Sequence, residues 1–125
     1  MATVELTADT FDSVVTDDKF VLIDFWAAWC GPCRMFAPIF EGASERHPDI
    51  VFAKVDTEAQ PELAAAFEVQ SIPTLAVIRE RVMLHSQPGA LPEQSLEQLI
   101  SQAKEIDMSE VRKHLAEGGE QEQAS

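Results

Sequence analysis

The chain of 125 residues is long enough for one domain that buries its own hydrophobic core. Hydrophobic residues make up 46% of it and charged residues 25%, which is an ordinary balance for a globular protein. Its net charge of −13 argues against nucleic acid and anionic lipid as partners, because both attract basic surfaces. No apolar run approaches the ~18 residues of a membrane span, and the first residues do not have the pattern of a signal peptide. We therefore expect a cytoplasmic protein that binds neither nucleic acid nor a membrane.

The first half of the chain predicts two strands and two helices in alternation. Thr3–Leu6 has the pattern of a short strand, and Thr7 is placed to cap a following helix. Phe20–Ala27 is almost continuously apolar, which is typical of a strand covered on both faces. A longer helix should begin at the two cysteines, with apolar residues at helical spacing that we assign to the core: Met35, Phe36, Ile39, Phe40 and Ala43.

The second half continues this alternation and then ends in a hairpin. Ile50–Asp56 predicts a strand, and Pro61 opens a short helix because proline suits a first helical position. Thr74–Ile78 and Val82–Ser86 predict two strands joined by a tight connection, and a helix opened by Pro92 follows them. The order implies an α/β fold, in which a mixed five-stranded sheet is flanked by four helices.

The chain has only two cysteines, Cys30 and Cys33, which are separated by Gly31 and Pro32. A structural disulfide across so short a loop would constrain little of the unfolded chain. A zinc site would need two more ligands, an iron–sulfur cluster would need more thiolates, and the histidines show no metal-ligand spacing. A Cys-x-x-Cys pair in a cytoplasmic β–α protein is typical of a redox motif. The structural and metal interpretations stay open as alternatives.

The position of Cys30 favours its ionised form. It lies where a helix is predicted to start, and unpaired backbone N–H groups together with the helix dipole stabilise an anion there. The thiolate is the nucleophile in thiol–disulfide exchange. Cys33 lies one helical turn further in, so we expect Cys30 to be the exposed attacking cysteine and Cys33 the buried resolving cysteine.

Asp24 interrupts an apolar strand. It alternates with Leu22 and Trp26, so its carboxylate should point into the interior. Burial disfavours the charged form and raises the pKa of a carboxyl group towards a value that is useful in proton transfer. An aspartate at a solvated edge or at a cap is the other interpretation of this residue.

Trp29-Cys30-Gly31-Pro32-Cys33 is identical to the active-site motif of the thioredoxin family, and the surrounding sequence is similar as well. Asp24–Ala27 precedes the motif and Pro38 follows it, whereas Ile72-Pro73-Thr74 comes about forty residues later and Gly89 follows the last strand. The resemblance covers roughly residues 3 to 106. It implies a thioredoxin fold, with a thioredoxin domain over residues 1–106 and a C-terminal extension over residues 107–125.

The extension has an apolar pattern of its own. Met108, Val111 and Leu115 are spaced as one face of a small helix that Gly118 would end. Glu120–Ser125 has the composition of a disordered segment. Two interpretations stay open, namely a docking helix for a partner and an appendage packed on the last helix of the domain.

The resemblance implies roles for several further residues. In thioredoxins the aspartate that matches Asp24 lies behind the second cysteine, which implies that Asp24 takes the proton from Cys33. Lys54 matches a lysine near this aspartate, and its other interpretation is an ordinary surface lysine. The bond that matches Ile72-Pro73 is cis in the family and leaves the preceding backbone free to pair with an extended substrate. The residues that the resemblance implicates in substrate binding are Trp29, Gly31, Pro32, Ile72, Pro73 and Gly89.

By this resemblance the chain is a protein-disulfide reductase that exchanges electrons through Cys30 and Cys33 and is re-reduced by a thioredoxin reductase. It would act as a monomer in electron transport and cell redox homeostasis, without a cofactor or a metal. Two other functions stay open. The first is an oxidant or isomerase, which in this family typically has a histidine where this chain has Gly31-Pro32. The second is a non-catalytic subunit that uses the surface around Trp29.

The connection between the last two strands departs from the family pattern. Many thioredoxins turn there with an Asn-Gly-like pair, whereas this chain has Arg79-Glu80-Arg81. None of these three is a glycine, which would supply positive φ without strain. The geometry of this hairpin therefore stays open, at a distance from the active site.

Overall fold

The computed structural model describes the backbone of residues 2–124 and the side chains of residues 2–117. A five-stranded sheet in the order β1-β3-β2-β4-β5 forms its centre. β1 and β2 run parallel to β3, whereas β4 runs antiparallel to both β2 and β5, so the sheet is mixed as predicted. The strands are β1 (Thr3–Glu5), β2 (Phe20–Trp26), β3 (Val51–Asp56), β4 (Thr74–Arg79) and β5 (Val82–Pro88).

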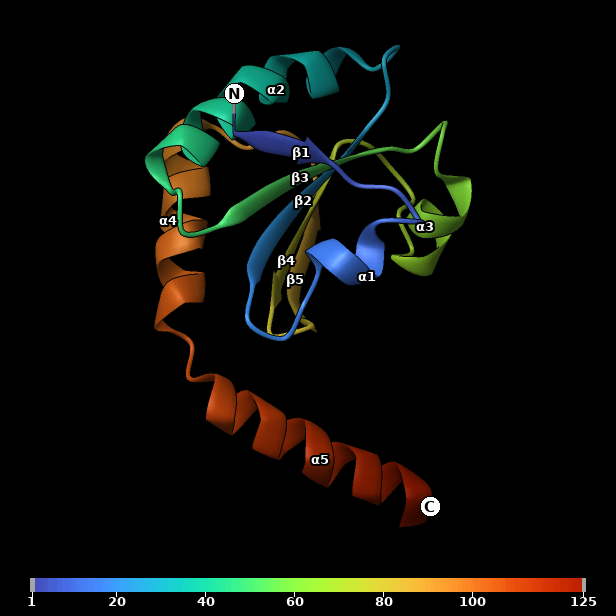
Figure 1. The fold of residues 1–125 in the computed structure, drawn as a ribbon, viewed down its shortest axis with the longest axis vertical. Helices are drawn as coiled ribbons and strands as arrows, with labels where there is room; N and C mark the ends of the chain where they lie inside the picture. The colour runs from blue at the N-terminus through green and yellow to red at the C-terminus, as the bar shows by residue number, and fades with distance from the viewer. Residues whose placement is uncertain (1, 125) are drawn as a thin grey trace.

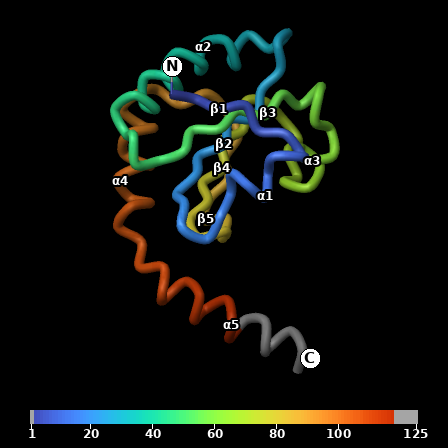
Figure 2. The backbone as a smooth tube through the Cα atoms, in the orientation of Figure 1, coloured from blue at the N-terminus to red at the C-terminus, as the bar shows by residue number. Residues whose placement is uncertain are grey.

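Four helices cover the two faces of the sheet. α2 (Gly31–Arg46) and α4 (Glu93–Glu105) pack on one face, and α1 (Phe11–Val14) and α3 (Pro61–Ala66) pack on the other (Figure 1). The chain bends after α4 and continues as α5 (Met108–Ala124) (Figure 2). The predicted class, a mixed sheet with four flanking helices and a helical extension, is confirmed.

The helix end predicted at Gly118 is wrong, because α5 continues to Ala124. The disorder predicted over Glu120–Ser125 stays a prediction, because the side chains of this segment lie outside the described residues. The division between residues 1–106 and 107–125 likewise stays a prediction. Before that segment, Met108 at the start of α5 is buried and Leu115 is exposed.

The central strand β2 shows how the sheet separates two apolar layers. Its residues from Val21 to Phe25 are all fully buried. Leu22 packs in the layer of α2 and α4, whereas Ile23 and Phe25 pack in the layer of α1 and α3. Because side chains alternate along a strand, Asp24 lies on the Leu22 face and points towards the layer of α2.

Two predictions about helix positions were wrong. Met35 was assigned to the core, but its side chain is 72% exposed. The cause is that α2 offers two adjacent apolar rows, and the row of Phe36 and Phe40 faces the sheet. Thr7 was assigned as a cap, but α1 begins at Phe11 and Thr10 occupies the N-cap position without a side-chain cap hydrogen bond.

The hairpin between β4 and β5 turns without glycine. Glu80 and Arg81 have φ values of 53° and 65°, which is the left-handed region that a tight two-residue hairpin turn requires. Contacts with distant elements accompany this conformation. Arg81 Nη1 donates a hydrogen bond to the Val15 carbonyl at 2.8 Å, and Glu80 forms an ion pair with Arg112 of α5. The turn that replaces the usual glycine-containing pair is therefore attached to α5 and, through the ion pair of Arg81 with Asp12, to α1.

Candidate active site

The two cysteines lie at the start of α2, and in this structure they form a disulfide with their Cα atoms 5.2 Å apart. Cys30 is the N-cap residue, and its Sγ accepts a hydrogen bond from the backbone N–H of Cys33 at 3.2 Å. This N–H belongs to the first helical turn and has no carbonyl partner within the helix, and it points at this sulfur. The same N–H and the helix dipole would stabilise negative charge on Cys30 Sγ after reduction.

Exposure does not distinguish the two cysteines, although the sequence predicted an exposed Cys30. In the disulfide form the exposed fraction is 4% for Cys30 and 3% for Cys33. Ile72 packs against the disulfide, and its carbonyl oxygen lies 3.7 Å from Cys30 Sγ. The predicted contrast is therefore absent from this form, and the two sulfurs differ in their positions on α2 and in their neighbours.

Asp24 is fully buried, as its place in the strand predicted. Neither carboxylate oxygen has a hydrogen-bond partner among the described residues. Burial raises the pKa of Asp24 to about 7, and the positive charge of Lys54 opposes this rise. Lys54 is the register neighbour of Asp24 on β3, so the parallel pairing of β2 with β3 brings the two residues together. An ionisable group with a pKa near neutrality thus lies beneath the helix that holds the cysteines.

A small cavity borders Cys33. Its volume is about 110 Å³, which is room for more than one water molecule. Lys54 Nζ lies 5.2 Å from the centroid of the Trp26 ring, and the Trp26 Nε1 is buried without a partner among the described residues. The cavity therefore offers polar groups and space for solvent beside this cysteine. Its lining residues are Trp26, Ala27, Ala28, Cys33, Arg34, Ala37 and Lys54.

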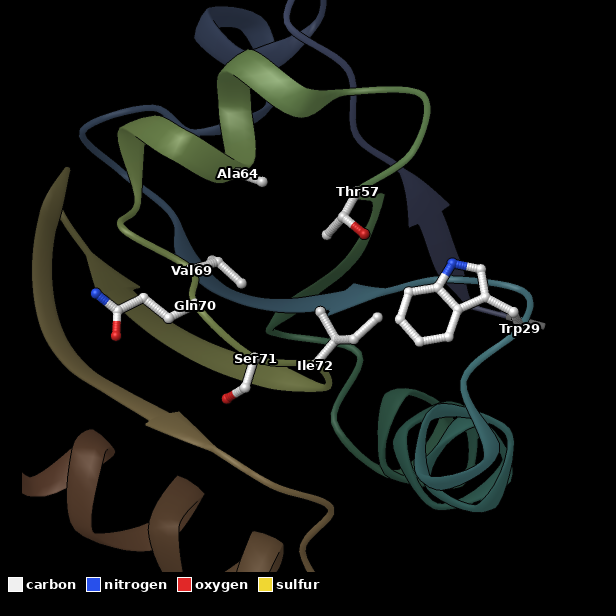
Figure 3. Close-up of a pocket in the computed structure, with 7 residues that line it drawn as sticks. All are labelled: Trp29, Thr57, Ala64, Val69, Gln70, Ser71 and Ile72. Atoms are coloured by element: carbon white, nitrogen blue, oxygen red, sulfur yellow. The ribbon is translucent and has the colours of Figure 1, made fainter.

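A larger and open pocket of about 430 Å³ lies on the Trp29 side of the disulfide. Trp29, with 67% of its side chain exposed, forms one end of this pocket, and Ile72 extends between it and Val69 (Figure 3). The indole Nε1 of Trp29 donates a hydrogen bond to the Glu58 carboxylate, which orients the ring. The remaining lining residues are Thr57, Ala64, Gln70 and Ser71.

The loops before β4 and after β5 meet at the same end of the sheet. The Ile72-Pro73 peptide bond is cis, as the resemblance implied. The backbone N–H of Gly89 donates a hydrogen bond to the Pro73 carbonyl at 2.8 Å, and Gly89 has a φ of 101° that only glycine adopts without strain. The structure therefore gathers Trp29, Ile72-Pro73 and Gly89 around the disulfide, although they are distant in the sequence.

Glu58, which orients the indole of Trp29 through its carboxylate, was not predicted from the sequence. The residue lies two positions after β3, and its backbone N–H donates to Asp56 Oδ1 at 3.0 Å. An aspartate that closes a strand and accepts such a bond forms a local turn. This turn was the available signal, but no local pattern indicates that the glutamate carboxylate reaches a tryptophan in another loop.

Of the helices in the described part of the chain, none is both long and apolar enough to cross a membrane. Within that part, no group of three or more His, Cys, Asp or Glu side chains is arranged to hold a metal ion.

Comparison with known proteins gives consistent matches. The family model named thioredoxin matches residues 2–102. A relative from Streptomyces coelicolor, whose name places it among the thioredoxins, is 62% identical over 116 residues, which cover 93% of this chain and 87% of that protein. Thioredoxin C-3 from Corynebacterium nephridii is 45% identical over 100 residues, which cover 79% of this chain and 69% of that protein. A crystal structure of thioredoxin from Malassezia sympodialis has a TM-score of 0.73 at 33% identity, covering 80% of this chain and 89% of that one.

These matches decide between the interpretations of the two cysteines. Cys30 and Cys33 are the redox pair of a thiol–disulfide oxidoreductase, which reduces protein disulfides by dithiol–disulfide exchange. The fold, the motif and the relatives agree, and the chain belongs to the thioredoxin family.

Proposed function

We propose that Cys30 is the attacking cysteine of this protein-disulfide reductase and that Cys33 is the resolving one. The main support is the position of Cys30 Sγ at the N-cap of α2, where it accepts the Cys33 N–H at 3.2 Å. The reduced Cys30 attacks one sulfur of a client disulfide. A new S–S bond joins the client to Cys30, the client's own S–S bond breaks, and its second sulfur leaves as a thiolate.

In the resolution step, Cys33 replaces the client as the disulfide partner of Cys30. Cys33 attacks Cys30 Sγ, the mixed disulfide breaks, and the client sulfur leaves as the second thiolate. Cys33 must lose its proton before it attacks, and Asp24 is the base that we propose for this step. Its pKa of about 7 lets the carboxylate accept a proton and release it again near neutral pH. Lys54, which moderates this pKa and lines the cavity beside Cys33, is the proposed electrostatic partner.

Client binding is proposed for the surface around the disulfide. The Ile72 carbonyl lies 3.7 Å from Cys30 Sγ, so an extended client segment that pairs with this main chain would place its own sulfur near Cys30. The pocket beside Trp29 would take an apolar client side chain. The complete set proposed for client binding is Trp29, Gly31, Pro32, Ile72, Pro73 and Gly89.

The oxidised protein needs two electrons for its next cycle, and we propose that a thioredoxin reductase supplies them. A relative from Mycobacterium leprae, 47% identical over 79 residues that cover 62% of this chain, is named a bifunctional thioredoxin reductase/thioredoxin. We further propose that residues 1–106 act as a monomeric thioredoxin domain in the cytoplasm, in electron transport and cell redox homeostasis.

The experiment that tests this function is reduction of insulin disulfides with a thioredoxin reductase as the electron source. The wild type should turn over, and Cys30→Ser should not, because it lacks the attacking sulfur. A Met83→Gln variant controls for a substitution at an exposed residue of β5, far along the chain from the cysteines. Turnover by Cys30→Ser at the wild-type rate would refute the proposal.

A further inference from the structure

Large apolar side chains are rarely exposed on this protein, and two of those that are exposed flank the redox pair. Trp29 directly precedes Cys30, and Met35 follows Cys33 by two residues. The Met35 side chain, at 72%, is the most exposed of the set. Among the described residues this set comprises Val4, Trp29, Met35, Met83, Ile106 and Leu115.

Met35 belongs to an uncharged strip on the outer side of α2. Residues three apart on a helix are neighbours on its surface, so Met35 lies between Pro32 and Pro38, which are both exposed. Gly31, one turn before Met35, joins this strip to the loop of the dithiol. We call Pro32, Met35 and Pro38 the outer α2 strip. It has no charged member, although a quarter of the whole chain is charged.

The core does not explain the choice of methionine at this position. Phe36 and Phe40 form the row of α2 that packs against the sheet, and Met35 lies outside both major core clusters. A side chain that is 72% exposed leaves little void when it is changed. A polar side chain at this position would be solvated at a lower free-energy cost than methionine. The apolar side chain therefore suits a surface that becomes covered when a partner binds.

We propose that Met35 is a specificity-determining contact for protein clients and extends the client-binding surface along the outer α2 strip. The occupant is the client whose disulfide Cys30 attacks, so the proposal rests on that role of Cys30. A client held at Cys30 would meet the pocket of Trp29 and Ile72 and also the outer α2 strip. The unbranched, polarisable thioether of methionine adapts to differently shaped apolar surfaces, which suits clients that share apolar side chains beside a disulfide.

The test compares a protein disulfide with a small one. KM and kcat are measured for insulin and for 5,5′-dithiobis(2-nitrobenzoic acid), with Met35→Gln, Met35→Leu and the control Met83→Gln. Met35→Gln should raise the KM for insulin by about five-fold, because a partly buried apolar contact is lost. Met35→Leu should restore the wild-type KM, and Met83→Gln should leave it unchanged. Reduction of the small disulfide should be the same in all variants, because it needs only the dithiol.

Several results would overturn the proposal. These are an unchanged KM for insulin in Met35→Gln, an equal rise in Met83→Gln, or a KM in Met35→Leu that stays as high as in Met35→Gln. Slower reduction of the small disulfide in Met35→Gln would also overturn it, since Met35 would then act on the dithiol itself. A wrong role for Cys30 would show itself differently, as insulin turnover by Cys30→Ser.

Discussion

Replacing Asp24 with asparagine should stabilise the protein, and the gain should grow with pH. Asp24 is fully buried and lacks a hydrogen-bond partner among the described residues. Burial raises its pKa to about 7, whereas the ordinary value, which applies to the unfolded chain, is 3.8. Between these values the folded protein keeps a proton that the unfolded chain has released. Asparagine has a similar shape and never ionises, so Asp24→Asn removes this difference.

The sign and the size follow from the two pKa values. Because the folded-state pKa is the higher one, the stability contributed by the protonated group is fully present below 3.8 and is lost as the pH rises through about 7. A pKa difference of about 3 corresponds to about 4 kcal/mol over the whole range. Between about pH 5 and about pH 8.5 the wild type should lose about 3 kcal/mol of this contribution, and Asp24→Asn should not.

The assay is urea unfolding of the disulfide forms at about pH 5 and about pH 8.5, with the free energy of unfolding taken by linear extrapolation. The advantage of Asp24→Asn over the wild type should be about 3 kcal/mol larger at the higher pH. Asp9→Asn removes an exposed carboxylate and controls for the change in net charge. An advantage of equal size at both pH values would show that burial does not perturb Asp24, and the proposed base would lose its physical support.

Three further predictions use the same unfolding measurement. Lys54→Gln should raise the pKa of Asp24 further, because the lysine charge opposes the effect of burial. In the Lys54→Gln background, the stability advantage of Asp24→Asn should therefore appear at a higher pH. An advantage that appears at the same pH in both backgrounds would contradict this. Burial alone would raise the pKa of Glu97. Hydrogen bonds from His47 and Arg46 outweigh this effect, so the pKa of Glu97 is lowered. Glu97→Gln should therefore lower the free energy of unfolding by about 1 kcal/mol at neutral pH. This loss should disappear as the pH falls through the lowered pKa of Glu97, and a loss of the same size in acid would refute the prediction. Glu68→Gly should stabilise by about 1 kcal/mol, because a φ of 56° strains a residue with a side chain, and any loss of stability would argue against this strain.

Much of the site follows from local rules and was predictable from the sequence. Alternation along the apolar run that forms β2 indicated that Asp24 points inward, and the structure confirms its burial. The spacing of Cys30 and Cys33 at a helix start predicted their proximity, and they form a disulfide. The parallel and antiparallel parts of the sheet followed from the order of strands and helices. Each of these depends on a short-range period or on the order of elements.

The features that the sequence did not predict depend on distant parts of the chain. Met35 and Phe36 begin two adjacent apolar rows on α2, and only the packing of α2 against the sheet selects the row that is buried. The left-handed turn at Glu80 and Arg81 contains no glycine that would have indicated it in the sequence, and its side chains contact α5 and α1. The bond between Glu58 and Trp29 joins two loops that no local pattern connects.

The different roles of the two cysteines are tested most directly by trapping a client. Cys33→Ser lacks the resolving sulfur, so with insulin it should accumulate a covalent complex joined through Cys30 and released by dithiothreitol. Cys30→Ser should accumulate little complex under the same conditions, and peptide mass spectrometry identifies the linked cysteine in each case. Complex formation by Cys30→Ser through Cys33 at a rate equal to that of Cys33→Ser would contradict the proposed order of attack.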